Sequence, residues 1–454
     1  MADVNDPGLL TPAETSLLID RYEITMAASY HRLGRNDPAV FELFVRRLPP
    51  HRNWLVACGL GPTLRIVTEM RFGPAEVEYL GTLGFNDEFL RYLEGFRFGG
   101  DIDAMPEGTI AFPNEPLVRV TAPLIEAQLL ETLLLNQINF QTMIATKAAR
   151  VVLAADGKGE SVVDFSPRRD HGVDAAMKVA RASAVAGLGG TSNMAAAMRY
   201  GLLPVGTMAH SYVLSFESEE EAFEAFMRGN PENALLLVDT YDTLEGVRHA
   251  IEASRRTEIP LTGVRIDSGD LAGLAREARR LLDEAGFDEA VIVASGDLEE
   301  HRIADMCRTG TPIDIWGVGT ELGTSRDSPV VNGVYKLVAE LSDGTWRGVA
   351  KLSEGKMTLP GTKQVFRRFD DGEMAEDIVG TAEEKLDGEP QLVPAMRDGE
   401  IVHPETLEEM RERTRRSLDS LPVALRSPGE KPPYPVRHSD GLTEAARSLG
   451  EQVG

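Results

Sequence analysis

Short apolar runs alternate with helical patterns along the middle of the chain, from about Leu130 to Val338. Four runs end in a polar or glycine-rich turn, and three helical patterns, at residues 244–256, 271–286 and 298–310, follow the first three. The runs are LLLVDTYDT, GVRIDSGD, VIVASGD and IDIWGVGT. Asp239, Asp267 and Ser295 follow one another at equal intervals of 28 residues, and Gly319 comes 24 residues later. This repeat of strand, turn and helix predicts βα units, and therefore a parallel β/α barrel or a doubly wound sheet.

In both architectures, ligands bind at the carboxyl ends of the strands. The turn residues are therefore predicted to share one ligand-binding edge. They are His210, Asp239, Asp267, Gly296 and Gly319. His210 is expected between a Gly-Thr turn and an apolar, strand-like run at residues 211–216. The alternative for each Asp or Gly is that it only forms a turn.

The two ends of the chain have a different pattern. Residues before about 130 predict short strands, tight turns and then a long helix, and residues after Lys336 predict hairpins with Asp-Gly turns. We expect these flanks to form a second, α+β domain. The predicted division is 1–134 and 339–425 for this domain, 135–338 for the β/α barrel, and 426–454 for an irregular tail rich in Pro, Gly and charge.

Composition narrows the classes of function. The chain has 454 residues and a net charge of −25, which disfavours nucleic acid and anionic membranes as partners. Two cysteines are too few for a disulfide framework and fit the reducing cytoplasm. The segment MADVNDPGLL lacks the features of a signal peptide, and no apolar run is long enough to span a membrane.

Two kinds of residue could bind anions. The turns at Ser295-Gly296 and Gly319-Thr320 can present backbone N–H groups to a phosphate, although ordinary turns have the same composition. In FSPRRDHG, Arg168 and Arg169 follow Phe165 and could bind a carboxylate or phosphate bidentately. The alternative is a pair of solvated surface arginines, and the sequence does not tell which of the two would contact a ligand.

Two further pairs could carry chemistry. Arg265 and Asp267 are two residues apart in a strand and point to the same side, where they could hold a sugar hydroxyl or simply close the barrel end as an ion pair. His210 would become a better nucleophile or base if Asp239 oriented its ring, whereas a lone histidine is more often structural. No CxxC or HExxH motif occurs, so no metal-binding residues are predicted.

Seven separated motifs together resemble those of nicotinate phosphoribosyltransferases, in the same order. They are LIDRYEITMAASY, FSPRRDHG, GLGGTSNMAAAMRYGLLPVGTMAHSYV, LLLVDTYDT, GVRIDSGDL, VASGDL and GVGTELGTS, the last followed by GVYKLV. The resemblance runs from about Leu17 to Leu352, and less clearly to about Phe369. It implies the type II phosphoribosyltransferase fold, in which an irregular β/α barrel is joined to an α+β domain, and a head-to-tail homodimer with shared active sites.

The resemblance also implies the reaction. A 5-phosphoribosyl group would pass from phosphoribosyl pyrophosphate (PRPP) to nicotinate, giving nicotinate mononucleotide and pyrophosphate for NAD biosynthesis. The transfer would need Mg²⁺ and be coupled to ATP hydrolysis through a phosphohistidine. Two alternatives stay open: an enzyme that uses nicotinamide instead, and a non-catalytic sensor that binds a phosphosugar or nucleotide.

Individual positions take roles from the same resemblance. His210 is similar to the phosphorylated histidine, and Asp239 to the carboxylate that orients it. Arg168 is similar to the arginine beside the nicotinate carboxylate. Phe165 and Tyr22 are similar to the two aromatic residues that stack on either face of the pyridine ring, with Tyr22 coming from the other subunit. Arg265, which binds substrate, and the catalytic Asp267 are similar to the pair near the ribosyl group. The 5′-phosphate site is matched by Ser295, Gly296, Gly319 and Thr320.

Overall fold

The computed structural model describes residues 15–351, 353, 358–429 and 431–453. The chain divides into two compact units, one formed by Arg150–Arg326 and the other by Met1–Ala149 with Asp327–Gly454. The predicted domain borders at 134/135 and 338/339 stay predictions. The prediction about a signal peptide concerns residues 1–10, which lie outside the described residues.

The unit Arg150–Arg326 is built on a parallel sheet, as the βα repeat predicts. Its strand order is β7-β6-β11-β10-β9-β8, and every neighbouring pair is parallel. The strands are β6 (Val162–Asp164), β7 (Gly190–Thr191), β8 (Leu235–Leu237), β9 (Gly263–Ile266), β10 (Val291–Ala294) and β11 (Ile315–Val318). Their central residues are buried on both faces, which is the pattern of a sheet covered by helices.

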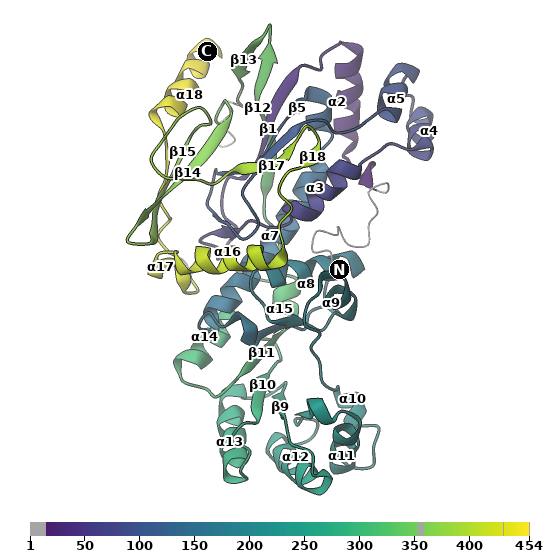
Figure 1. Cartoon of the computed structure of the whole chain (residues 1–454), viewed down its shortest axis with the longest axis vertical. Coiled ribbons are helices and arrows are strands. Elements are labelled where there is room, and N and C mark those ends of the chain that lie inside the picture. The colour runs from purple at the N-terminus through teal and green to yellow at the C-terminus, as the bar shows by residue number, and fades with distance from the viewer. Residues whose placement is uncertain (1–14, 352, 354–357, 430, 454) are drawn as a thin grey trace. The chain divides into compact units, whose positions relative to one another are not determined.

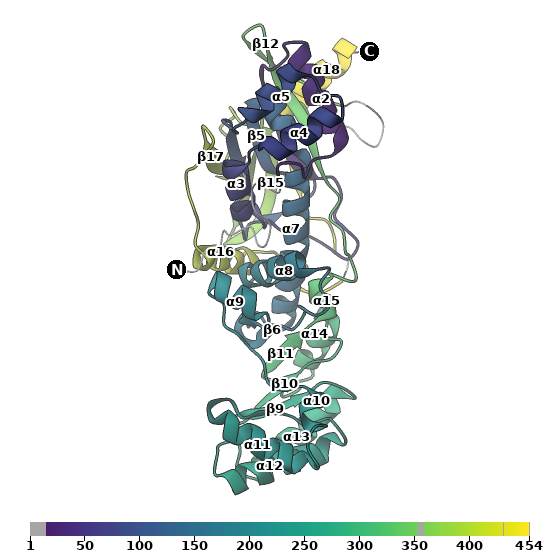
Figure 2. The same ribbon diagram turned by 90° about the vertical axis from the view of Figure 1, so that its right-hand side faces the viewer.

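Helices connect these strands. They are α8 (Val173–Val185), α9 (Met194–Tyr200), α10 (His210–Val213), α11 (Glu219–Gly229), α12 (Thr243–Thr257), α13 (Leu271–Glu284), α14 (Glu300–Arg308) and α15 (Thr320–Gly323), with 3₁₀ turns η1 (Gly159–Ser161) and η2 (Pro231–Asn233). Asp242 and Asp270 begin α12 and α13 as N-caps that accept backbone N–H groups. Helix α12 packs against both α11 and α13, and the three lie side by side in both views (Figures 1 and 2).

The strand-like run predicted after His210 is wrong, because residues 210–216 form helical turns. Leu214 N donates to the His210 carbonyl over 2.9 Å, and Phe216 N to the Val213 carbonyl over 3.2 Å. The ring of Tyr212 contacts the rings of Phe216 and Phe226, which lies in α11. Val213 is therefore fully buried and Tyr212 packs on a helix rather than in a sheet, while Leu214 is exposed.

The second unit confirms that both ends of the chain build one α+β domain. Its main sheet has the strand order β13-β12-β1-β5-β3-β17-β18, with antiparallel pairing throughout (Figure 1). The strands are β1 (Pro38–Val45), β3 (Asp101–Ala104), β5 (Pro116–Pro123), β12 (Gly333–Ser342), β13 (Thr345–Gly348), β17 (Val393–Arg397) and β18 (Glu400–Ile401). The three strands from before residue 124 thus lie together in the centre of the sheet, with two strands from after residue 332 on each side of them.

Two smaller sheets complete this unit. One has the order β16-β14-β15-β19 and the other pairs β2 with β4. Their strands are β2 (Leu55–Val56), β4 (Ile110–Ala111), β14 (Lys363–Asp370), β15 (Glu373–Thr381), β16 (Glu389–Pro390) and β19 (Val436–His438). The predicted hairpin turns are present at 343–344 and 371–372, where Asp and Gly both have positive φ angles.

Nine helices belong to the described part of this unit, although the last turn of α7 extends past residue 149 into the other unit. They are α2 (Arg21–Arg32), α3 (Leu60–Glu69), α4 (Pro74–Thr82), α5 (Asp87–Glu94), α6 (Leu124–Gln128), α7 (Glu131–Ala154), α16 (Leu407–Asp419), α17 (Val423–Arg426) and α18 (Asp440–Val453). The prediction of an irregular tail is wrong where β19 and α18 form. Ser439 accepts the Leu442 N–H at the start of α18, and Leu442 is fully buried, so the tail has a cap and an apolar contact that its composition hides.

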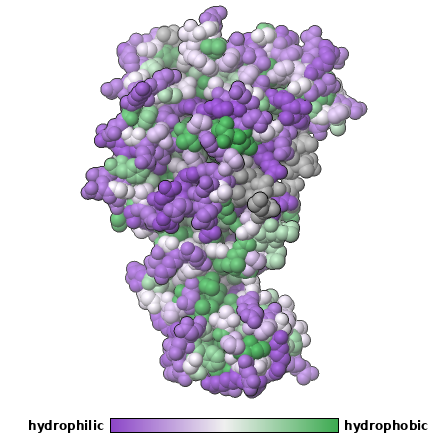
Figure 3. Space-filling model, in the orientation of Figure 1, coloured by the Kyte–Doolittle hydropathy of each residue, from purple (hydrophilic) through white to green (hydrophobic). Residues whose placement is uncertain are grey.

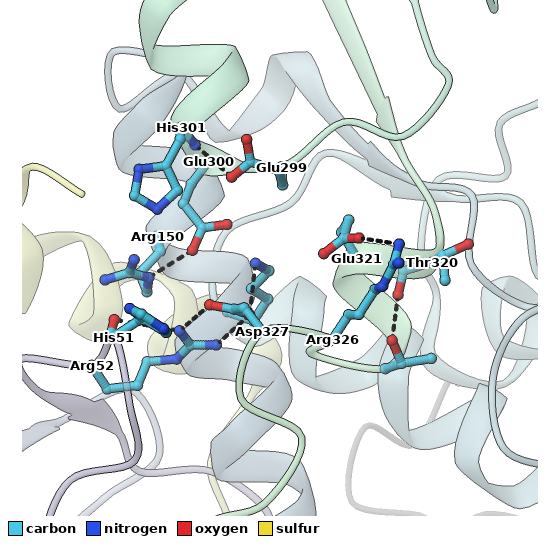
Figure 4. Close-up of polar contacts among 12 residues, drawn as sticks. His51, Arg52, Arg150, Glu299, Glu300, His301, Thr320, Glu321, Arg326 and Asp327 are labelled. Atoms are coloured by element: carbon cyan, nitrogen blue, oxygen red, sulfur yellow. Dashed lines mark hydrogen bonds and ion pairs between the residues drawn. The ribbon is translucent and has the colours of Figure 1, made fainter. Parts of the chain in front are cut away.

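A buried ion-pair network ties α7 to the segment that follows residue 326. Asp327 lies 2.7 Å from the Arg52 guanidinium and 2.9 Å from Lys147 Nζ (Figure 4). The side chains of Arg52 and Lys147 are only 2% and 1% exposed. Although burial alone raises the pKa of Asp327, the two cations hold that pKa below its usual range.

Substituting Asp327→Asn is therefore expected to lower the free energy of unfolding by about 3 kcal/mol, because two buried cations lose this carboxylate. Since the folded pKa is depressed, the stabilisation is complete above the ordinary aspartate pKa and is lost as pH falls through the folded value. Urea unfolding at neutral pH measures the change. Asp305→Asn is the matched control, because its pair with Arg308 is exposed on both sides. Equal stabilities for the two variants would contradict the prediction.

The face of the molecule shown in Figure 3 is mainly hydrophilic. Figure 3 shows hydrophilic residues over much of the face in view, interrupted by smaller hydrophobic patches. Among the described residues, no helix combines the length and the apolar character needed to cross a bilayer.

Candidate active site

The carboxyl ends of four neighbouring strands bring the predicted site residues to one edge of the parallel sheet. Leu237 of β8 is in register with Arg265 of β9, which is in register with Val293 of β10. Ala294 pairs in turn with Trp316 of β11. Because these positions are level, the residues just after each strand lie at the same edge.

Arg265, Asp267 and Ser295 form a hydrogen-bonded cluster at this edge. Arg265 Nη2 donates to Asp267 Oδ1 and Nε donates to Ser295 Oγ, each over 2.8 Å. Ser295 Oγ also donates to Asp267 Oδ1. Burial raises the pKa of Asp267, but the hydrogen bond from Ser295 and the charges of Arg265 and His210 outweigh it, so the pKa lies below its ordinary value. Asp267 is consequently a fixed anion at neutral pH.

His210 and Asp239 lie next to this cluster. Asp239 Oδ2 accepts the Asp267 N–H over 2.9 Å and the Ser268 hydroxyl over 2.7 Å. Its Oδ1 is buried, accepts no hydrogen bond from a described residue, and lies 3.8 Å from His210 Nε2. His210 Nδ1 lies 3.1 Å from Thr240 Oγ1. The imidazole is 41% exposed whereas the Asp239 side chain is 1% exposed, so the ring is accessible and the carboxylate behind it is not.

Phe165 follows β6 and joins the cluster through its ring. The Arg265 guanidinium carbon lies 5.0 Å from the ring centroid, in cation–π contact. A Cβ on Gly317 would come within 2.5 Å of this ring, so only glycine leaves room for it there. Phe165 N donates to the Val318 carbonyl over 2.8 Å, which extends the pairing of β6 and β11.

Asp164 stabilises the turn that positions the Phe165 side chain by accepting hydrogen bonds. Asp164 is not among the site residues predicted from the sequence. Asp164 Oδ1 accepts both the N–H and the hydroxyl of Ser166, and Oδ2 accepts the Thr191 hydroxyl over 2.8 Å. An Asp side chain that bonds the N–H two residues on stabilises a turn, and this local signal could have revealed it. Burial raises the pKa of Asp164, and burial together with Asp164 raises the pKa of nearby Asp170 to about 6.

The two predicted phosphate turns follow adjacent strands. Gly296 has a φ of +93°, and a Cβ there would lie 1.9 Å from the Asp267 carbonyl oxygen. This turn therefore requires glycine and packs directly on the Arg265 cluster. Gly319 precedes Thr320, which is the first residue of α15. The Thr320 carbonyl accepts a hydrogen bond from the Thr324 hydroxyl over 2.7 Å (Figure 4). In the same loop Arg326 pairs with Glu321 at 3.1 Å.

The structure does not bring every predicted residue into this cluster. Tyr22 belongs to α2 in the other compact unit and is 48% exposed. Arg168 and Arg169 are both exposed, and neither guanidinium has a hydrogen bond or ion pair with the described residues.

Sequence reasoning also missed Thr240 and Ser268, which contact His210 and Asp239. Both stand directly after a predicted Asp, so their positions in the turns were a usable signal. Among the described residues, no group of three or more His, Cys, Asp or Glu side chains could hold a metal ion by itself.

Family models match most of the chain. The nicotinate phosphoribosyltransferase N-terminal domain matches residues 17–139, and the nicotinate phosphoribosyltransferase family model matches residues 161–358. These stretches contain all the predicted site residues: Tyr22 falls in the first and the strand-end cluster in the second.

Similar proteins carry the same description. The chain is 48% identical to nicotinate phosphoribosyltransferase pncB2 of Mycobacterium tuberculosis, over 95% of this chain and 93% of that protein. It is 42% identical to the nicotinate phosphoribosyltransferase of Bacillus subtilis, over 78% and 73% of the two chains. Human nicotinic acid phosphoribosyltransferase has a similar structure, with a TM-score of 0.84 and 27% identity over 95% of this chain and 100% of the human one. The chain belongs to the nicotinate phosphoribosyltransferase family.

Proposed function

We propose that the protein transfers the 5-phosphoribosyl group of PRPP to the ring nitrogen of nicotinate, in NAD salvage, and couples this transfer to ATP hydrolysis. The observation that carries the proposal is the strand-end cluster of His210, Asp239, Arg265 and Asp267, in a chain of this family. The cluster places an accessible imidazole beside a hydrogen-bonded group of two carboxylates and a guanidinium.

In the transfer step, the bond between C1′ and the pyrophosphate oxygen breaks and its electron pair leaves with pyrophosphate. The nicotinate nitrogen donates its lone pair to C1′, giving the mononucleotide. Nicotinate is a weak nucleophile, so positive charge develops on the ribosyl group, and the carboxylate of Asp267 stabilises it. Phe165 stacks on the pyridine ring, and Arg168 or Arg265 faces the nicotinate carboxylate. Holding the nitrogen and C1′ in line supplies much of the rate.

In the coupling step, a ring nitrogen of His210 attacks the γ-phosphorus of ATP. A nitrogen–phosphorus bond forms, the bond to the bridging oxygen breaks, and ADP leaves. Water later hydrolyses the phosphohistidine to inorganic phosphate. Asp239 orients the imidazole, since its buried Oδ1 accepts no hydrogen bond from a described residue and lies 3.8 Å from Nε2 of the ring. The added phosphoryl charge reorganises the loops that bind PRPP, and its loss promotes product release.

The residues present suit Mg²⁺ brought in by the substrates. Mg²⁺ is often held by phosphate oxygens with one or two carboxylates rather than by a full protein cage, and the described residues form no such cage. Asp267, ionised and 32% exposed at the strand edge, is the carboxylate that would hold the ion. When bound, the ion neutralises charge on the leaving pyrophosphate.

The proposed active site needs residues from two copies of the chain. Tyr22 is proposed to stack on the other face of the pyridine ring in a partner's active site, because its exposed ring lies in the other compact unit. The active form would then be a head-to-tail homodimer, in the cytoplasm.

The test is to incubate the purified protein with PRPP, nicotinate, Mg²⁺ and ATP and to measure nicotinate mononucleotide by chromatography. Parallel reactions contain nicotinamide, or lack ATP. Formation of the mononucleotide, faster with ATP and far slower with the amide, supports the proposal. Preference for the amide would instead indicate a nicotinamide enzyme, and ligand-dependent stabilisation without turnover would indicate a sensor.

The close contact between Gly317 and the Phe165 ring allows a prediction for nicotinate binding. Gly317→Ala places a Cβ within 2.5 Å of the ring and must displace it. We expect the KM for nicotinate to rise roughly tenfold, from the ~1.4 kcal/mol that a lost aromatic contact is worth, with the KM for PRPP little changed. Steady-state kinetics measure both constants. Gly229→Ala is the control, since a Cβ there meets nothing within 4 Å. An unchanged nicotinate KM would show that Phe165 does not bind the ring.

A further inference from the structure

Two glycines bring β11 and α15 into close contact with the loop at residues 165–170. A Cβ on Gly317 of β11 would lie 2.5 Å from the Phe165 ring. On Gly323, the last residue of α15, a Cβ would lie 1.9 Å from Asp170 Oδ1. Because glycine leaves room for the loop at both positions, the loop contacts these neighbouring segments at its first residue and at its last.

The Asp170 carboxylate is poorly supplied with hydrogen-bond donors. Its Oδ2 lies 3.2 Å from Ser166 Oγ, but that hydroxyl lies 2.6 Å from Asp164 Oδ1 and can donate only one hydrogen. Asp170 Oδ1 is buried and accepts no hydrogen bond from a described residue. Burial, and then the charge of Asp164, raise the pKa of Asp170 to about 6. The side chain therefore acts on α15 through its shape rather than through its charge.

Between these two contacts the loop carries residues that are proposed to bind nicotinate. Phe165 is its first residue, and Arg168 and Arg169 come directly before Asp170. Arg169 N donates to the Ser166 carbonyl over 2.6 Å, which closes a tight turn within the loop. Since neither arginine side chain has a hydrogen bond or ion pair with the described residues, the backbone of the loop decides where the guanidiniums can reach.

We infer that Asp170 is a positioning residue for the transfer step, because its contact with Gly323 fixes the loop at residues 165–170 relative to the turn at Gly319-Thr320. This inference rests on the proposed function, which assigns nicotinate to the loop and the 5′-phosphate of PRPP to the turn. The turn leads directly into α15, which ends at Gly323, so the contact ties the two binding segments together. Holding the pyridine nitrogen in line with C1′ requires a fixed separation of these segments, since a displacement of about 1 Å can cost about 10²-fold in rate.

The experiment compares Asp170→Ala, Asp170→Asn, Gly323→Ala and the double variant Asp170→Ala/Gly323→Ala with the wild type. Initial rates of mononucleotide formation in the presence of ATP give kcat and the KM for each substrate. We expect Asp170→Ala to raise the KM for nicotinate and the KM for PRPP together, with kcat/KM falling roughly tenfold for each. Asp170→Asn should keep the wild-type constants, because asparagine has the same shape and the contact does not need the charge.

The double variant tests the contact itself. Gly323→Ala pushes a methyl group against the Asp170 carboxylate, and removing that carboxylate relieves part of the clash, while Ser166 Cβ stays 2.6 Å away. The loss in the double variant should therefore be smaller than the product of the two single losses, by about threefold or more. Losses that simply multiply would show that the two residues act independently, and they would overturn the inference.

Asp305→Ala and Gly229→Ala are the matched controls, because Asp305 is exposed on α14 and a Cβ on Gly229 meets nothing within 4 Å. Thermal unfolding checks that each variant is folded, since a loss of folded protein lowers kcat and leaves both KM values unchanged. A fall in kcat alone, or an Asp170→Asn variant as impaired as Asp170→Ala, would overturn the inference and leave the transferase. Wild-type protein that makes no mononucleotide would overturn the proposed function itself.

Discussion

Replacing His210 by alanine is expected to abolish phosphohistidine formation and all stimulation by ATP. In the proposed function the imidazole is the nucleophile that accepts the phosphoryl group. Thr240 and Asp239, which lie next to it, have no side-chain nitrogen that could accept this group instead. The variant should still bind PRPP and nicotinate, because Arg265, Asp267 and Phe165 are untouched. Its turnover with ATP should therefore equal that of the wild type without ATP.

Two measurements check this expectation. Labelling with γ-labelled ATP, read as acid-labile protein phosphate, should fall to background, and mononucleotide formation should no longer respond to ATP. His301→Ala, an exposed histidine on α14, should label and respond as the wild type does. If His210→Ala still became labelled, another residue would carry the phosphoryl group and the role given to His210 would be wrong.

Much of the fold could be predicted because its signals are local. Helices α12 and α13 have Asp caps and strong apolar periodicity, and each follows an apolar run that becomes a buried strand. The Asp-Gly turns of the two hairpins are equally local. The errors came where tertiary contacts decide: α10 forms because Tyr212 packs on Phe226, and α18 forms because Leu442 is buried. Neither contact is visible in the flanking sequence.

The sequence predicts which residues of the site lie at the strand ends, but not which of their side chains contact one another. Equal spacing of the βα units places Asp239, Asp267 and Ser295 at one edge, and the structure links them by hydrogen bonds. Spacing cannot tell which turn side chains point inward, so Arg168 and Arg169 stay undistinguished.

The second large effect is expected for Asp267→Asn. The substitution keeps the size of the side chain and removes one charge, so the fold should survive while the Arg265 cluster loses its anion. Because Asp267 would stabilise the positive ribosyl group, kcat/KM for PRPP should fall about 10²-fold, a typical loss when one preorganised electrostatic group is removed. The phosphohistidine should still form, since His210 and Asp239 remain.

The pH dependence sharpens this expectation. Since the pKa of Asp267 is held below its ordinary value, the carboxylate stays charged through the working range, and protonation of Asp267 should not limit the wild type until pH falls below the ordinary aspartate pKa. The loss in Asp267→Asn should consequently be the same at every pH from 6 to 9. Asp270→Asn is the matched control, because asparagine also caps a helix and Asp270 only caps α13. A loss that appeared in both variants would trace to the turn at residues 267–270 rather than to the charge of Asp267.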